Sequence, residues 1–272
     1  MSITLLKTVG IPGGRRLGYR EDGTGVPVFL LHGIGPGSQS WEHQFAGLRD
    51  KYRAIAWDMP GYGGSDPLPM ESPRPKDYAD DLLALMTALK IQKAHVLGQS
   101  VGAMIAACFA HHYPARVLSL VLTAASSGTG TLDLPTRQRN LKERLDALAK
   151  NGPDGLAQIA AAKSVAPGTP ATIIDDLAEH ISMLTPEGYN PAVHMLINND
   201  INQELGHITV PTLVMCGTGD PVTPEPSVRK IAEQISGATF RRLPGLGHCA
   251  FFENPEMYNT ALRDHLGGVK QA

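Results

Sequence analysis

The feature that most constrains the fold is a series of short runs, each ended by a turn-forming glycine, aspartate, serine or proline. These runs lie at 26–31, 53–57, 94–97, 117–123, 212–216 and 239–243. Most are apolar along their whole length and do not alternate with polar residues, which is typical of parallel strands buried on both faces. Two earlier segments, 3–9 and 16–21, flank a Pro-Gly-Gly turn and predict a short antiparallel start to the sheet.

Helical patterns separate these strands. Residues 77–89 place apolar side chains three to four positions apart, and residues 255–266 close the chain with a further helix. Residues 101–112 are small and apolar almost throughout, as expected for a helix packed on the middle of a sheet. This alternation of strands and helices predicts an α/β fold, with a doubly wound sheet covered by helices on both faces.

One long stretch contains helical patterns only. They lie at 137–149, 155–164, 171–183 and 191–205. An insertion between two strands of such a sheet is expected over the carboxyl ends of the strands, where α/β proteins bind ligands. We therefore predict a core formed by residues 1–126 and 207–272, with an all-helical cap at 127–206.

Composition excludes several classes of function. The 272 residues carry 24 Lys and Arg against 26 Asp and Glu, so no basic surface for nucleic acid is indicated. No apolar run is long enough to span a membrane, and the first residues lack a signal-peptide core, which favours a cytoplasmic location. Three cysteines and no spaced His or Cys cluster indicate neither a disulfide framework nor a metal site. We expect a small-molecule substrate and leave homo-oligomerisation open.

The strongest chemical signal is Gly98-Gln99-Ser100-Val101-Gly102, which follows a predicted strand and opens a predicted helix. This is the context of a nucleophile elbow, in which the flanking glycines relieve crowding around a strained serine. The hydroxyl of Ser100 would lie at a helix N-terminus, which favours developing negative charge. Taken alone, the pentapeptide could also be a serine N-cap before a tightly packed helix.

A serine nucleophile needs a base, and the base needs a group that orients it. Asp220 follows the strand at 212–216, and His248 follows the strand at 239–243. Alone, each could be a loop residue that caps a turn or binds the backbone. Together they stand at strand ends in the order serine, acid, histidine, which predicts a catalytic triad of Ser100, Asp220 and His248.

A glycine-rich loop, His-Gly-Ile-Gly-Pro-Gly at 32–37, follows the strand at 26–31. Acyl transfer requires two N–H donors aimed at the oxyanion, and we predict the backbone amides of Ile34 and Val101 for this role. A phosphate-binding loop is disfavoured, because the spacing fits neither GxxxxGK nor GxGxxG.

With these motifs, the loop at 58–66 and the Glu-Asn-Pro at 253–255, the sequence resembles the α/β-hydrolase superfamily over essentially its whole length. The resemblance implies an eight-stranded, mostly parallel sheet, a helical lid and hydrolysis without a cofactor. Serine at position 100, in place of a carboxylate, disfavours dehalogenase and epoxide-hydrolase chemistry.

Within the superfamily, the 32–37 loop followed by Ser40-Trp41 resembles carbon–carbon bond hydrolases of ring-fission (meta-cleavage) products. Three positions depart from that group: Gln99 replaces Asn, Cys249 replaces Trp, and His43 replaces Asn. We therefore expect a small carboxylic ester or lactone as substrate, with carbon–carbon cleavage as the alternative. A hydrolase-fold ligand receptor and a cofactor-free oxygenase are further alternatives with no positive feature in the sequence.

Several other residues are candidates for the substrate pocket because of their place beside these motifs. They are Gly33, Gly35, Trp41, Gln99, Arg137, Arg144 and Cys249. Trp41 is expected either to pack in the core or to touch substrate, and Cys249 to be a small pocket-lining residue. Arg137 and Arg144 form either a solvated helix face or an anchor for a substrate carboxylate.

Overall fold

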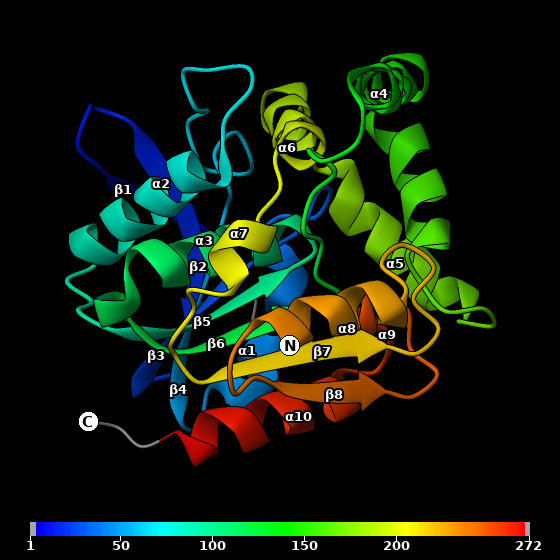
Figure 1. The fold of residues 1–272 in the computed structure, drawn as a ribbon. Helices are drawn as coiled ribbons and strands as arrows, with labels where there is room; N and C mark the ends of the chain where they lie inside the picture. The colour runs from blue at the N-terminus through cyan, green and yellow to red at the C-terminus, as the bar shows by residue number, and fades with distance from the viewer. Residues whose placement is uncertain (1–3, 270–272) are drawn as a thin grey trace.

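The computed structural model describes residues 4–269 and contains one eight-stranded sheet with the order β1-β2-β4-β3-β5-β6-β7-β8 (Figure 1). The strands are β1 (Lys7–Gly10), β2 (Arg16–Asp22), β3 (Val26–Leu31), β4 (Tyr52–Trp57), β5 (Ala94–Gln99), β6 (Val117–Thr123), β7 (Thr212–Gly217) and β8 (Thr239–Leu243). Strand β2 pairs antiparallel with β1 and β4, and the remaining pairs are parallel. The predicted mostly parallel sheet is confirmed, although Ile3, where the first strand was expected to begin, lies outside the described residues.

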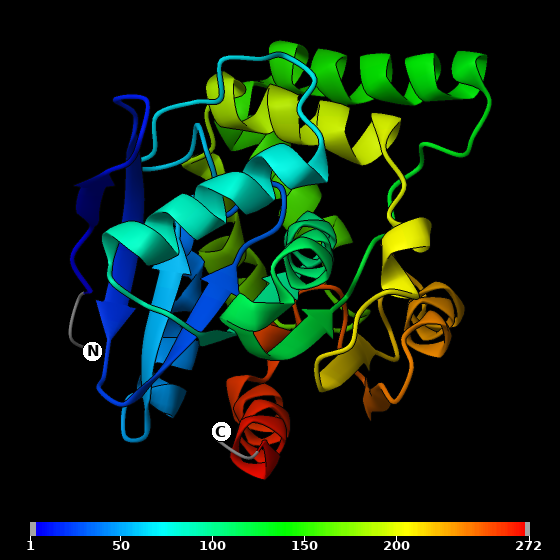
Figure 2. The same cartoon turned by 60° about the vertical axis from the view of Figure 1, so that its left-hand side comes forward.

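Helices cover both faces of the sheet (Figure 2). They are α1 (Glu42–Leu48), α2 (Pro75–Ala88), α3 (Val101–His112), α8 (Glu225–Gln234), the short α9 (Ala250–Glu253) and α10 (Pro255–Gly268). Short 3-10 turns, η1 (Ser38–Trp41) and η2 (Pro114–Arg116), precede α1 and β6. Helix α1 packs against α10, whereas α2 packs against α3. Every residue of β5 and β7 is buried, which explains why these strands show no apolar–polar alternation.

Four helices lie between β6 and β7: α4 (Leu134–Lys163), α5 (Ala171–Ser182), α6 (Pro186–Asn198) and α7 (Asn202–Leu205). Helix α4 bends at Gly152, whose φ of 65° is non-helical, so its two arms match the separate helices expected at 137–149 and 155–164. Helix α5 packs on η1 and α9 and lies nearest the carboxyl ends of β7 and β8 in Figure 1. The inserted helices therefore border the loops that follow the strands.

The two ends of this insertion are joined to each other. Ile201 N–H donates to Ser127 O at 2.9 Å, and Gly130 N–H donates to Asn199 O at 2.9 Å. The segments that enter and leave the insertion therefore lie side by side and are joined by backbone hydrogen bonds. Of the helices formed by residues 4–269, none is both long enough and apolar enough to cross a membrane.

Candidate active site

Ser100 lies in the turn between β5 and α3 with φ 56° and ψ −117°, a backbone conformation that non-glycine residues rarely adopt. The two glycines of the pentapeptide are explained by close backbone approach. A Cβ at position 98 would overlap the carbonyl oxygen of Gly102, and one at position 102 would overlap that of Leu31. The turn therefore holds Ser100 at the N-terminus of α3, as the motif predicts.

Asp220 and His248 are brought together from the loops after β7 and β8. Asp220 Oδ2 lies 3.0 Å from His248 Nδ1, and both residues are buried. Asp220 Oδ1 accepts the amides of Val222 and Thr223, each at 2.8 Å. Burial by itself raises the pKa of Asp220, but the hydrogen bonds from His248 and Thr223 outweigh it and hold this pKa below its usual value. The carboxylate is therefore ionised at neutral pH and accepts Nδ1–H of the imidazole.

Thr223 is a member of this cluster that the sequence reasoning missed. Its Oγ1 donates to Asp220 Oδ2 at 2.7 Å and lies 3.1 Å from His248 Nδ1. A hydroxyl three residues after an acid is a common turn signal, so its position in the sequence does not separate this role from simple capping. Thr223 Oγ1, Asp220 Oδ2 and His248 Nδ1 therefore lie within hydrogen-bond distance of one another.

The hydroxyl of Ser100 is partly exposed and, within the described residues, makes no hydrogen bond to His248. Such contacts commonly tighten only once substrate is bound. Ser100, Asp220 and His248 thus follow the carboxyl ends of β5, β7 and β8 at the same end of the sheet, with the acid–base pair already formed.

The 32–37 loop lies directly beside Ser100. A Cβ at position 33 would overlap Gln99 Oε1 and would approach Ser100 Cβ to 3.1 Å, so a larger residue there would displace the Gln99 side chain. Neither the amide of Ile34 nor that of Val101 has a hydrogen-bond partner among residues 4–269. Two unpaired N–H donors therefore flank the serine, which is what stabilisation of an oxyanion requires.

His32 and Asp58 hold this loop in place. His32 Nδ1 donates to Gly33 O at 2.8 Å, and its Nε2 accepts the amide of Met59 at 2.9 Å. Burial lowers the pKa of His32, which keeps the ring neutral and able to make both bonds. Asp58 Oδ1 accepts the amide of Ser38 at 2.8 Å, which ties the 58–66 loop to the glycine-rich loop.

The remaining candidates beside the motifs are mostly packed. Gln99 is buried and donates its Nε2 to His248 O at 3.3 Å. Gly35, with φ 119°, faces Ile181 of α5, whose Cγ2 would lie 3.2 Å from an added Cβ.

Trp41 is fully buried and stacks on Phe251 with ring centroids 4.7 Å apart, so the structure places it in the core. Burial raises the pKa of the Cys249 thiol, which keeps it protonated and unreactive.

Arg137 and Arg144, both on α4, form no side-chain hydrogen bond to Ser100, Asp220 or His248 within residues 4–269. Arg137 Nε donates to Leu132 O at 3.1 Å and its Nη1 to Asn198 Oδ1 at 3.3 Å, so it binds the insertion itself. Arg144 is exposed on α4. Arg144 therefore fits the solvated-face interpretation, whereas Arg137 is held by other residues of the insertion.

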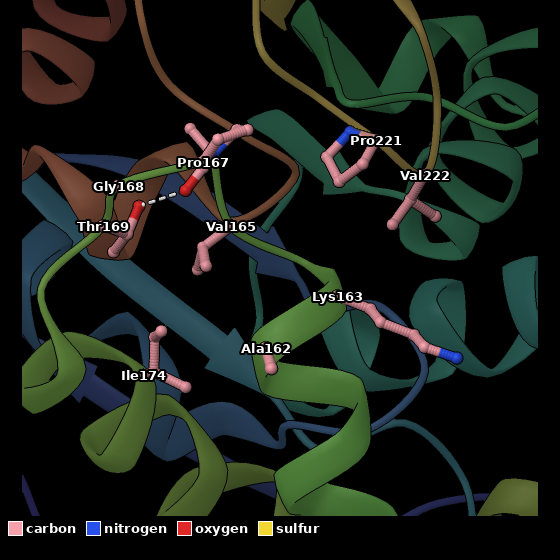
Figure 3. Close-up of a pocket in the computed structure, with 10 residues that line it drawn as sticks. Ala162, Lys163, Val165, Pro167, Gly168, Thr169, Ile174, Pro221 and Val222 are labelled. Carbon is pink, nitrogen blue, oxygen red and sulfur yellow. Dashed lines mark hydrogen bonds between the residues drawn. The ribbon is translucent and has the colours of Figure 1, made fainter.

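A largely apolar cavity of about 490 Å³ lies between the α4–α5 loop (residues 164–170) and the loop that begins at Asp220 (Figure 3). Its walls include Val165, Ile174, Pro221 and Val222. Lys163 belongs to the lining but points away from the other labelled side chains in Figure 3. The cavity borders the acid side of the cluster, and Ser100 is not among its lining residues.

Comparison with known proteins identifies the family of this chain. The model of the alpha/beta hydrolase fold matches residues 26–255. The chain belongs to the alpha/beta hydrolase fold family. It is 26% identical to 3-oxoadipate enol-lactonase 2 of Acinetobacter baylyi over 238 residues, which is 86% of each chain.

Two further relatives cover nearly the whole of this alpha/beta hydrolase. A 2-hydroxy-6-oxononadienedioate/2-hydroxy-6-oxononatrienedioate hydrolase of Paraburkholderia xenovorans is 28% identical over 264 residues, 92% of this chain and 90% of the relative. The malate-bound structure of a thermophilic esterase from Thermogutta terrifontis matches with a TM-score of 0.88 and 27% identity, covering 98% of this chain and all of the esterase. The protein is an enzyme of the hydrolase class.

Proposed function

We propose that this alpha/beta hydrolase cleaves a small carboxylic ester or lactone through an acyl-enzyme on Ser100, without a cofactor. The observation that carries the proposal is the strained turn at Ser100, flanked by the unpaired amides of Ile34 and Val101. The Asp220–His248 pair at the same sheet edge supplies the base. Nucleophile, base, orienting acid and oxyanion donors are the parts that acyl transfer needs.

In this mechanism Ser100 Oγ attacks the carbonyl carbon while His248 Nε2 takes its proton. Nδ1–H stays bonded to Asp220, whose negative charge stabilises the imidazolium. The two amides bind the oxyanion of the tetrahedral intermediate. Collapse expels the alkoxide, which takes the proton from Nε2, and water then repeats the sequence on the acyl-enzyme to regenerate Ser100.

The surroundings of Gln99 support an ester or lactone as substrate. Carbon–carbon cleavage first places a proton on a substrate carbon, so the site must also stabilise a dienolate. Gln99 is the amide beside the nucleophile that could contribute, but its Nε2 already donates to His248 O. Ester and lactone hydrolysis need only the triad and the two amides. Similarity to an enol-lactonase and to an esterase agrees with this choice.

Carbon–carbon hydrolysis of a ring-fission product is the second candidate. It is favoured by the similarity to the Paraburkholderia xenovorans hydrolase and by the His-Gly-Ile-Gly-Pro-Gly loop at 32–37 followed by Ser40-Trp41. Both candidates use the same serine, so the substrate and not the nucleophile separates them.

Two measurements on one preparation test the proposal. A fluorophosphonate probe should label a single serine, and Ser100→Ala should lose both the label and nearly all turnover. Steady-state kcat/KM is then compared for a short aryl ester, a lactone and a 2-hydroxy-6-oxo-dienoate. We expect the ester or lactone to give the higher value. A hundredfold preference for the dienoate, about 2.7 kcal/mol of transition-state stabilisation, would replace the first candidate by the second.

A further inference from the structure

The backbone on either side of His248 is fixed by hydrogen bonds to other segments. Gly247 N–H donates to Glu253 Oε1 at 2.8 Å, and Cys249 N–H donates to Ser164 O at 3.0 Å. The carbonyl of His248 itself accepts Nε2 of Gln99 at 3.3 Å. The peptide groups before Gly247 and after His248 are thus held, which restrains the backbone that carries the imidazole.

Glu253, the last residue of α9, joins this backbone to the inserted helices. Its Oε1 accepts the amide of Gly247, and its Oε2 accepts the amide of Ala166 at 2.9 Å. Thr169 Oγ1 lies 3.1 Å from Oε2 and 2.8 Å from Ala166 O, so its one hydroxyl proton is shared between the two. Ala166 and Thr169 belong to the α4–α5 loop. One carboxylate therefore binds the histidine loop with one oxygen and the inserted helices with the other.

The packing at this junction leaves little room for independent movement. A Cβ at Gly247 would overlap the backbone of Val165 and Ala166, and one at Gly219 would lie 3.3 Å from Ala166 Cβ. The α4–α5 loop therefore rests on the loop before His248 and on the loop before Asp220. A displacement of this loop breaks the Cys249 bond to Ser164 O and removes the partner of Glu253 Oε2, the carboxylate that also binds Gly247.

We propose that Glu253 is a positioning residue that couples the alignment of His248 to the seating of the α4–α5 loop. The inference rests on the proposed function, in which His248 is the base. It adds that the base is aligned only while the inserted helices are seated on the core. A substrate that holds the inserted helices against the core also aligns the imidazole of His248. The reason is that Glu253 binds both the α4–α5 loop and the loop that carries His248.

The first test is Glu253→Gln. An amide offers one acceptor oxygen, and its NH₂ group faces a donor, so either Gly247 or the α4–α5 loop loses its partner. We expect kcat per active site to fall about ten- to hundredfold, as misplaced catalytic groups do, while KM changes less than about threefold. Active sites are counted by fluorophosphonate labelling of Ser100. Glu256→Gln is the matched control, because that carboxylate is exposed and, among residues 4–269, binds only Thr260 and Arg263 of its own helix.

Thr169→Val tests the coupling from the side of the inserted helices, because it removes the hydroxyl that contacts Glu253 Oε2 and Ala166 O and leaves the Gly247 bond in place. We expect a two- to fivefold loss of kcat alone, and little further loss when it is combined with Glu253→Gln. A lower melting temperature with unchanged kcat per labelled site in either variant would reduce Glu253 to a structural brace and overturn the coupling. Failure of the wild-type enzyme to label at Ser100 would instead overturn the proposed function, so the two failures are distinct.

Discussion

The nucleophile side and the acid–base side of the candidate site are held by different physical means. Around Ser100 the restraint is steric, since glycines at 33, 98 and 102 fit where a Cβ would overlap neighbouring atoms. Around Asp220 and His248 close packing at Gly247 contributes too, but the restraint on the two side chains and their loops is mainly polar, from groups such as Thr223 and Glu253. Backbone crowding makes one side rigid as part of the sheet, whereas the other side depends on contacts between separate loops.

This difference predicts different responses to substitution. Changes on the nucleophile side force the backbone of the sheet apart, so they should appear mainly as lost stability. Changes on the acid–base side remove a hydrogen bond from an otherwise intact loop, so they should appear mainly as lost turnover per folded molecule.

The largest effect is expected from Asp220→Asn. The amides of Val222 and Thr223 can still bind the side-chain oxygen, so the loop should keep its shape. The charge that orients and stabilises the imidazolium is lost, and kcat should fall about 10⁴-fold. Steady-state kinetics with the ester substrate measure this, and a thermal melt close to that of wild type is the control. A near-wild-type rate would mean that another residue supplies the acid.

Gly98→Ala tests the steric side. The added methyl group overlaps the Gly102 carbonyl oxygen, which belongs to backbone and cannot swing away. We expect the free energy of unfolding to fall by about 4 kcal/mol or more, at the upper end of single-substitution effects. Urea unfolding measures it. Gly206→Ala, at a glycine with open space around it, should change stability by less than about 0.5 kcal/mol. Equal effects of the two substitutions would contradict the steric account.

The same contrast explains how much of the site the sequence could predict. The sheet, the elbow and the order serine, acid, histidine are local patterns, because each strand and the turn after it are adjacent in the chain. Helix α8 was not predicted, because its apolar side is limited to Val228, Ile231 and Ala232 among charged residues. Helix α1 is only seven residues long, too short for a clear periodicity.

The polar restraints could not be predicted, because their partners are distant in the chain. Glu253 binds Ala166 across 87 residues, and Gln99 binds His248 across 149. A glutamate near a predicted histidine loop is an ordinary surface residue until the fold shows which amides it faces. The partner of Arg137 could not be predicted for the same reason, since Asn198, which binds its guanidinium within the insertion, is 61 residues away.

The pH dependence of stability should separate the two sides again. Burial lowers the pKa of His32 below its usual 6.5, so the unfolded chain binds this proton more readily than the folded one. Its contribution is therefore full above pH 6.5 and declines as the pH falls below that value, by at most about 1.4 kcal/mol per pH unit. The pKa of Asp220 lies below its usual 3.8, so its contribution is full above pH 3.8 and is lost only on further acidification.

Urea unfolding of the wild type and of His32→Gln between pH 7 and pH 4.5 measures the contribution of His32. That contribution is the difference between the two proteins in how the free energy of unfolding changes with pH. Other buried histidines titrate in both proteins and cancel. We expect the wild type to lose stability faster over this range, because only it protonates a ring that binds Met59 and Gly33. Parallel pH curves would show that the glycine-rich loop does not depend on a neutral His32.

The smallest effect is expected from Thr223→Val, which removes one hydroxyl from the polar side without changing its shape. Asp220 keeps its two amide bonds and the bond from His248, so the carboxylate stays buried and ionised. What is lost is the donor at 2.7 Å that fixes Oδ2 in front of the imidazole. One hydrogen bond to a charged group corresponds to about 1.5 kcal/mol, or roughly tenfold in kcat. Thr223→Ser restores the hydroxyl and should restore most of the rate, which a simple packing defect would not do. If valine and serine gave the same kcat, the restraint on the acid would reside in the backbone amides, and the two sides of the site would be more alike than their contacts suggest.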